Sequence, residues 1–252
     1  MRVTSDLVSA PYVEMTLRVM EAFGAHSERD DDLRNIVVPP GGYLACDYRV
    51  EPDASAASYF FALAAATGGE VVVPGLGSDS LQGDLLFVEV LREMGAEVEV
   101  DESATKVSGT GALRGLEVDM SEISDTAQTL AAVAPLATGP TTVEGIGFIR
   151  QKETDRVAAV VTELRRLGVD AEETDDGFVV RPGPISPGVV QTYDDHRMAM
   201  SFAVLGLVAP GVSISDPTCV AKTFPGFWGA VERLRRPTGS PDGRVGDAAG
   251  AA

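Results

Sequence analysis

An internal repeat of about 70 residues is the feature of this sequence that most restricts its fold. Three helix-like segments end at Gly24, Gly95 and Gly168, so that successive glycines are 71 and 73 residues apart. Apolar residues recur one, four and seven positions before each glycine. This spacing places an apolar stripe on one helix face, and glycine is a frequent C-terminal stop. The pattern therefore predicts three amphipathic helices in equivalent positions of similar blocks.

A second set of helices alternates with the first. Segments 58–69, 129–139 and 198–211 are apolar on every side and rich in alanine, which is typical of helices that are buried all round. A short β-branched run follows each of them, and pairs of short strands follow the amphipathic helices. The predicted unit is buried helix, strand, amphipathic helix, strand, strand. It indicates an α/β fold built from repeated supersecondary blocks.

Composition excludes several classes of protein. The chain has 252 residues and a formal net charge of −18, with 44% apolar residues, enough for a substantial core. So acidic a chain is a poor nucleic-acid binder and a poor match for an anionic membrane surface. No apolar run is long enough for a transmembrane helix. The only cysteines, Cys46 and Cys219, form no Cys-x-x-Cys motif; we expect two small buried side chains and a reducing cytoplasm.

The repeat also divides the chain. The sequence opens in the second half of a unit, at residues 6–38, so that either the first unit is atypical or an N-terminal part is missing. Residues 39–48 are interpreted as a linker. Residues 237–252 are rich in proline, glycine and alanine and predict a disordered tail.

Polar residues gather at the predicted helix starts, which a bare scaffold does not require. The candidates are Ser9, Tyr12, Asp125, Lys152, Glu153, Arg156, His196, Arg197 and Lys222. Helix N-termini offer free N–H groups and partial positive charge, and aligned repeats would bring them to one edge of the domain. Four cations beside two carboxylates and a histidine suit an anionic substrate and acid–base chemistry. No convincing metal-ligand spacing or nucleophile elbow is present, so neither a metal nor a cofactor is expected.

Structural explanations compete with the functional ones. Asp125 with Gln128 fits a capping box, and Asp195 fits an N-cap. Lys152 and Glu153 fit a solvated surface pair.

Three other polar residues have structural interpretations as well. His196 is equally well explained as a structural histidine. Gln82 and Asp84 are interpreted as a helix start only.

Several motifs, in order and in register, resemble the 3-phosphoshikimate 1-carboxyvinyltransferase (EPSP synthase) family over residues 5–234. They are SAPYVEMTL (9–17), EPDASAASYF (51–60), KETDR (152–156), DDHRMAM (194–200) and DPTCVAKTFP (216–225). The resemblance implies an inside-out α/β barrel of βαβαββ units, with buried parallel helices and outer sheets. It also implies that residues 1–48 end an N-terminal lobe and that residues 49–236 form most of a C-terminal lobe.

The implied reaction transfers the carboxyvinyl group of phosphoenolpyruvate to the 5-hydroxyl of shikimate 3-phosphate and releases phosphate. It belongs to the shikimate pathway, which leads through chorismate to aromatic amino acids, and glyphosate inhibits many family members. The ligands bind in the cleft between the two lobes. The resemblance further implies that a missing N-terminal portion would supply more cationic residues and complete the site.

The resemblance assigns roles residue by residue. Asp125 orients and deprotonates the attacking hydroxyl, while Glu153 donates a proton to the methylene carbon and later accepts it. His196 lies beside this set and tunes it. Three cations are implied to contact phosphoenolpyruvate: Arg156, Arg197 and Lys222. Three residues, together with Asp125, are implied to contact shikimate 3-phosphate: Ser9, Tyr12 and Lys152.

Two departures and two alternatives remain open. Phe148 stands where the family often has a substrate-contacting asparagine, and Asp194 stands where asparagine is common. One alternative is an enolpyruvyl transferase that acts on a UDP-N-acetylglucosamine-type acceptor, although KETDR and DHRMAM argue against it. The other is a non-catalytic fragment that binds anions or a partner chain.

Overall fold

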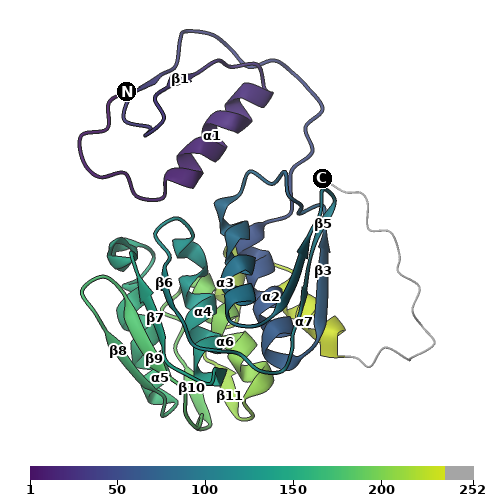
Figure 1. The fold of residues 1–252 in the computed structure, drawn as a ribbon, viewed down its shortest axis with the longest axis vertical. Helices are drawn as coiled ribbons and strands as arrows, with labels where there is room; N and C mark the ends of the chain where they lie inside the picture. The colour runs from purple at the N-terminus through teal and green to yellow at the C-terminus, as the bar shows by residue number, and fades with distance from the viewer. Residues whose placement is uncertain (236–252) are drawn as a thin grey trace, which may run out of the picture.

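The computed structural model describes residues 1–235, and these form a small lobe and a large lobe (Figure 1). The small lobe holds helix α1 (Ala10–Ala22) and an antiparallel pair, β1 (Glu28–Arg29) and β2 (Ile36–Val37). An extended segment without regular structure joins it to the large lobe, as expected for a linker at residues 39–48. The predicted disordered tail at 237–252 lies outside the described residues.

Three helices form the centre of the large lobe: α2 (Ala54–Thr67), α4 (Ala127–Val133) and α6 (His196–Val208). They pack against one another in all three pairings. Every residue of α4 is buried, and α2 and α6 bury nine residues each. Small alanine side chains allow this close packing, because a helix that contacts neighbours all round has no polar face to offer water. The expected buried helices are confirmed.

Sheets lie outside these three central helices (Figure 1). The first has the order β3-β5-β4, with bounds Glu70–Pro74, Ala104–Ser108 and Glu97–Val100. The second has the order β6-β7-β9-β8, with bounds Glu117–Asp119, Thr141–Glu144, Phe178–Arg181 and Asp170–Glu173. The third pairs β10 (Gly188–Val190) with β11 (Val212–Ile214). In the part of the chain that is described, the sheets are separate, so they surround the helices without closing a hydrogen-bonded barrel.

The pairing register of β7 with β9 places the apolar side chains of the second sheet on the face that covers the central helices. Antiparallel pairing sets Thr141 opposite Val180 and Val143 opposite Phe178, and all four side chains are buried. Because strand side chains alternate between faces, this register turns one whole face toward the central helices.

The amphipathic helices follow the predicted order. The three predicted ones are α1 in the small lobe, α3 (Phe87–Glu93) and α5 (Arg156–Arg166). A further helix, α7 (Phe227–Arg235), was not part of the prediction. Gly24, Gly95 and Gly168 have φ of 79°, 111° and 80°, the left-handed conformation in which glycine ends helices. The order α2-β3-α3-β4-β5 recurs as α4-β7-α5-β8-β9. Both the repeat unit and the α/β class are therefore confirmed.

Short 3-10 turns carry several of the candidate residues. They are η1 (Gly83–Leu86), η2 (Ser124–Thr126), η3 (Ala134–Leu136), η4 (Gly147–Gln151) and η5 (Thr218–Lys222). The expectation of two buried cysteines is wrong for Cys46, which lies exposed in the linker, and Cys219 is half-buried. Within residues 1–235, no helix is long and apolar enough to cross a membrane.

Candidate active site

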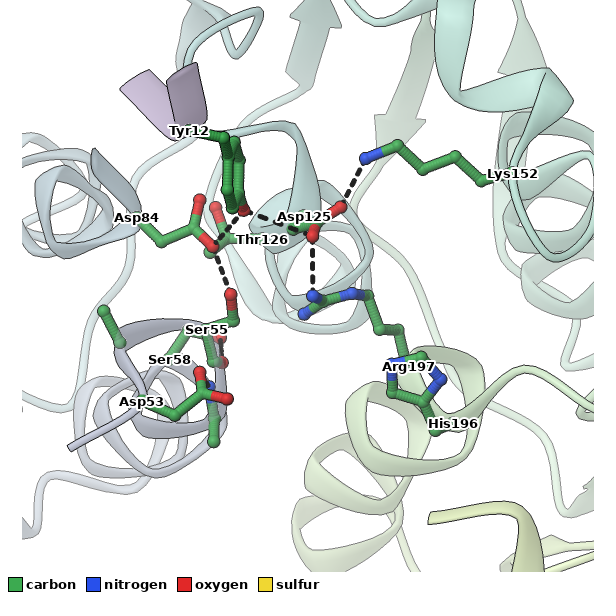
Figure 2. Close-up of polar contacts among 12 residues, drawn as sticks. Tyr12, Asp53, Ser55, Ser58, Asp84, Asp125, Thr126, Lys152, His196 and Arg197 are labelled. Carbon is green, nitrogen blue, oxygen red and sulfur yellow. Dashed lines mark hydrogen bonds and ion pairs between the residues drawn. The ribbon is translucent and has the colours of Figure 1, made fainter. Parts of the chain in front are cut away.

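The N-terminal ends of the three central helices meet on one side of the large lobe (Figure 2). A hydrogen bond of 3.0 Å between the Ser58 and Thr129 hydroxyls joins the N-terminal halves of α2 and α4. Arg197, in the first turn of α6, reaches Asp125 immediately before α4. The resulting charged group is called the helix-end cluster: Asp125, Lys152, Glu153, Arg156, Asp195, Arg197 and Lys222.

Asp125 accepts hydrogen bonds from three cations. Lys152 Nζ and Arg156 Nη1 lie 2.5 and 3.1 Å from Oδ1, and Arg197 Nη2 lies 2.6 Å from Oδ2. The Asp125 side chain is 14% exposed. Burial alone would raise the pKa of Asp125, but the charges of Arg197 and Lys152 outweigh burial and hold this pKa well below its ordinary value. Asp125 is therefore ionised, and its lowered pKa makes it a weak base while the three cations contact it.

The two N-cap predictions have opposite outcomes. Asp125 caps nothing, because Thr126 holds the N-cap position of α4 and makes no side-chain cap bond. Gln128 is buried and its amide has no hydrogen-bond partner among the described residues, so the capping box is wrong. The Asp195 N-cap is confirmed, since its carboxylate accepts from the backbone N–H of Arg197 at 2.8 Å.

Glu153 lies between two cations. Arg156 Nη2 donates to Glu153 Oε2 at 2.6 Å, and Lys222 Nζ donates to Oε1 at 2.5 Å. Burial raises the pKa of Glu153, but the hydrogen bond from Lys222 and the nearby positive charges prevail and lower it to about 2. The solvated pair of Lys152 with Glu153 is wrong, because Lys152 contacts Asp125 instead.

Arg156 links three carboxylates. Its side chain is 1% exposed, and Nε donates to Asp195 Oδ2 at 2.8 Å, while the two Nη atoms bind Asp125 and Glu153. Asp195 is fully buried. A planar guanidinium can satisfy several carboxylates at once. Arg156 thus has all three of its nitrogen atoms on carboxylates, and a substrate oxyanion would compete with these carboxylates for it.

The two lysines occupy different positions from those expected. Lys222 is the last residue of η5, and Lys152 directly follows η4, so neither is at a helix start. Their side chains are 55% and 26% exposed, the two most open cations of the cluster. Phe148 lies beneath Lys152, with Nζ 5.7 Å from the ring centroid, a geometry that favours the cation.

His196 and Ser9 make fewer contacts. His196 is 3% exposed, and its Nδ1 has no hydrogen-bond partner in residues 1–235, lying 3.8 Å from Asp195. Burial and the charge of Arg197 lower the pKa of His196, so the ring is neutral at neutral pH. Ser9 precedes α1 with φ of 55° and makes no side-chain cap bond; no hydrogen bond joins it to the helix-end cluster.

Two consecutive residues with a strained backbone precede α6. Tyr193 and Asp194 have φ of 55° and 57°, a conformation that is unfavourable for residues with a Cβ and persists only where the surroundings enforce it. Asp194 is exposed. The turn delivers Asp195 and Arg197 into the cluster.

Sequence reasoning missed Asp84. This residue is 4% exposed and accepts hydrogen bonds from Tyr12 and Ser55 (Figure 2). Asp84 does lie at a helix start, in the first turn of η1, but the expectation that it does nothing more is wrong, because its side chain contacts Tyr12 and Ser55. One signal was available: Asp84 lies in η1, directly before the amphipathic helix α3, and polar residues also gather before α5 in the next repeat.

The arrangement of helices and sheets places the chain in a structural class. It superposes on the enolpyruvyl transferase NikO from Streptomyces tendae with a TM-score of 0.71 at 21% identity, over 91% of this chain and 54% of that one. This likeness defines the fold as that of enolpyruvyl transferases. An EPSP synthase from Acinetobacter baumannii superposes with a TM-score of 0.73 at 27% identity, over 92% and 54% of the two chains.

Sequence comparison identifies the family. The family model described as EPSP synthase (3-phosphoshikimate 1-carboxyvinyltransferase) matches residues 1–231, and the chain belongs to this family. The 3-phosphoshikimate 1-carboxyvinyltransferase of Nostoc punctiforme is 50% identical over 226 residues, 90% of this chain and 53% of the relative. The chloroplastic enzyme of Brassica napus is 43% identical over 244 residues, 93% and 47% of the two. The chain thus spans about half the length of the curated relatives it matches.

Proposed function

We propose that this chain contributes the helix-end cluster to an active site that transfers the carboxyvinyl group of phosphoenolpyruvate to the 5-hydroxyl of shikimate 3-phosphate. The observation that carries the proposal is the pair of ionised carboxylates, Asp125 and Glu153, held by four cations at one edge of a family fold. The names of the relatives give the reaction, and the geometry supports the roles below.

The charge balance of the cluster supports a site shared with another segment. Among the described residues, the four cations of the cluster pair with three carboxylates, which are Asp125, Glu153 and Asp195. This leaves one positive charge in excess. Two polyanionic substrates need more than that, because a buried anion is stable only when it is paired. We infer that the portion of the relatives not matched by this chain supplies further cations, and that residues 1–48 and 49–236 belong to the two lobes that close on the ligands.

Addition is the first chemical step. Asp125 accepts the proton of the 5-hydroxyl while that oxygen attacks C2 of phosphoenolpyruvate. Glu153 gives a proton to C3, which becomes a methyl group, and a tetrahedral intermediate forms. In the elimination that follows, Glu153 takes a proton back from C3, the bond from C2 to the phosphate oxygen breaks, and phosphate leaves with the proton that Asp125 accepted.

Both carboxylates begin ionised, and neither has a pKa suited to its role while the cations contact it. Asp125 has the charge of a base, but its lowered pKa makes it a weak base until the anionic substrates compete for Lys152 and Arg197. Glu153 has a pKa of about 2 while Lys222 and Arg156 contact it, so it must gain a proton before it can act as a donor. Phosphoenolpyruvate brings negative charge that competes for Lys222 and Arg156. Losing these contacts raises the pKa of Glu153 toward the range of a general acid.

The remaining roles follow from position. Lys222, Arg156 and Arg197 face Glu153 and Asp125 and would hold phosphoenolpyruvate. Shikimate 3-phosphate would be held by Lys152 and Tyr12, which both contact Asp125, and by Ser9, which directly precedes α1. His196 is neutral and buried beside Arg197. It would help to position the Arg197 guanidinium and would modify the electrostatic potential around it.

We also propose a cytoplasmic setting. Both cysteines are free thiols, as expected in a reducing compartment.

A phosphate-release assay tests the proposed reaction. The chain is mixed with the segment of the Nostoc punctiforme relative that it does not match, and both substrates are supplied. We expect release that requires both substrates and both polypeptides, with little release from the chain alone. No release by the mixture, together with no binding of shikimate 3-phosphate in calorimetry, would refute the proposal.

Two other results would replace the proposed function with one of the alternatives. Turnover of UDP-N-acetylglucosamine but not of shikimate 3-phosphate would identify the other class of enolpyruvyl transferase. Tight binding of both anions with no turnover would identify a non-catalytic anion-binding protein.

A further inference from the structure

Asp84 is a buried carboxylate that the proposed chemistry leaves unused. It has no ion-pair partner among residues 1–235, and its Oδ1 has no hydrogen-bond partner there. Burial raises the pKa of Asp84, opposed by hydrogen bonds from Ser55 and Tyr12 and by the charge of Arg197, while Asp125 adds to the rise. An isolated buried carboxyl group is costly to retain. A contact that needs this group would explain its presence.

The contact that Asp84 makes joins the two lobes. The Tyr12 hydroxyl, on α1 of the small lobe, lies 2.8 Å from Asp84 Oδ2 and 3.2 Å from Asp125 Oδ2 (Figure 2). A tyrosine hydroxyl has one proton to donate. The shorter distance is to Asp84, so this carboxyl group sets the direction of the Tyr12 O–H bond.

The surroundings hold Asp84 itself in place. Ser55, in the first turn of α2, donates to the same Oδ2 atom. The neighbouring Gln82 accepts from the backbone N–H of Ala54 at 2.8 Å and donates to the carbonyl of Pro52 at 2.7 Å. These bonds tie η1 to the start of α2, one of the three central helices. Asp84 is therefore mounted on the rigid part of the large lobe.

A second feature at the same place indicates close contact between the lobes. A Cβ atom added to Gly83 would lie 2.6 Å from Cβ of Pro11, which is closer than real Cβ contacts. Pro11 directly precedes Tyr12 in the first turn of α1. Glycine at position 83 thus lets the helix approach η1 closely enough for Tyr12 to reach Asp84.

We propose that Asp84 is a positioning residue that holds the Tyr12 hydroxyl, and with it α1, against the large lobe. The inference deepens the proposed function, because Tyr12 is there assigned to shikimate 3-phosphate. Asp84 would place the hydroxyl where the substrate arrives and leave the reacting carbons untouched. Its loss should weaken binding of shikimate 3-phosphate and spare the chemical step.

Hydrogen exchange of the 252-residue chain tests the contact without any substrate. Compared with wild type, Asp84→Ala and Tyr12→Phe should each speed exchange of the α1 amides about tenfold, the effect of one lost hydrogen bond. The double variant should show no further increase, because both changes remove the same bond. Asp84→Asn keeps an acceptor and should retain much of the protection. Asp79→Asn, which removes a nearby exposed carboxylate, is the matched control and should change nothing.

Opposite outcomes overturn the inference. Unchanged α1 exchange in Tyr12→Phe, a variant that keeps the packing of the ring, would do so even if Asp84→Ala failed to fold. Additive effects of Asp84→Ala and Tyr12→Phe would also do so, because they would mean that the two residues act separately.

Kinetics of the reconstituted pair separates positioning from simple stabilisation. Asp84→Ala should raise KM for shikimate 3-phosphate about tenfold while kcat and the KM for phosphoenolpyruvate stay near wild type. In the Tyr12→Phe background it should add nothing, and a fall in kcat with unchanged KM would contradict the proposed role. If the wild-type pair neither turns over nor binds shikimate 3-phosphate, the proposed function fails, while the exchange experiment still decides whether Asp84 holds Tyr12.

Discussion

Replacing Arg156 by methionine should destabilise the protein far more than replacing an arginine at the surface. The guanidinium is 1% exposed and binds Asp195, which is fully buried and has no other Lys or Arg partner in the described residues. Methionine fills similar space but leaves a buried carboxylate without its cation. Breaking such a pair by removing one partner costs about 3–5 kcal/mol. For a domain of this size the change corresponds to a fall in Tm of about 6 to 20 °C.

Urea unfolding and calorimetry at pH 7 measure this loss. The matched control is Arg181→Met, which removes a guanidinium that is 39% exposed and pairs with Asp170 and Glu172 at the surface; it should cost less than about 1 kcal/mol. In the double variant Arg156→Met/Asp195→Asn part of the stability should return, because the uncompensated charge is gone. If Arg156→Met were no worse than the control, the reasoning about buried charge would be refuted.

Three further outcomes are expected. Gly177→Ala should cost at least about 1–3 kcal/mol of unfolding free energy, because the added Cβ would lie 1.9 Å from the Val143 carbonyl oxygen. Gly183→Ala is the control and should be near neutral, since nothing lies within 4 Å of its added Cβ. Equal Tm values for the two variants would contradict the packing around Gly177. Folding lowers the pKa of Asp125, so its ionised form stabilises the protein above the unfolded pKa of about 4, and this stabilisation is lost as the pH falls further. Asp125→Asn should therefore make the unfolding free energy fall less steeply on acidification. An unchanged dependence of the unfolding free energy on pH would count against the ion pairs of Asp125. Lys222→Met should raise the pKa of Glu153 above about 2, measured by carboxyl NMR titration, and an unmoved titration would show that Lys222 does not control this group.

The repeated architecture could be predicted because local signals and tertiary packing agree. The three helix-ending glycines all adopt positive φ, and the alanine-rich segments became the buried helices. Such periodicity depends only on neighbours three and four residues away, so it is visible in the sequence. Closure of the outer sheets into a barrel depends on long-range pairing, and the described sheets remain separate.

The sequence predicted which residues lie together better than it predicted the contacts that they make. Two motifs contained Arg156 and Arg197, and a predicted helix start contained Asp125; the structure brings the three side chains together. Capping statistics suggested a local partner for Asp125, but three cations from other elements took that role. A capping preference describes an isolated helix end. It takes no account of charged residues that lie 27 to 72 positions from Asp125 in the sequence and that the fold brings into contact with it.

Two residues were misjudged for the same reason. Asp84 looked like an ordinary helix start, yet it accepts a hydrogen bond from Tyr12, which is 72 residues away in the sequence. Cys46 was expected to be buried, as free cysteines commonly are, but it lies in the exposed linker. Burial of one side chain depends on which segments cover it, and the composition of a segment does not contain that information.

Deuterium transfer is the most direct measurement of the proposed chemistry at the helix-end cluster. The reconstituted pair is run in D2O with both substrates, and NMR follows deuterium at the methylene carbon that comes from phosphoenolpyruvate. If Glu153 carries the proton to and from C3, deuterium enters this carbon during turnover, and Glu153→Gln slows its entry by a factor of about 10²–10⁴. Deuterium entry at the wild-type rate in Glu153→Gln would contradict the central proposal, because the proton would then move through another group.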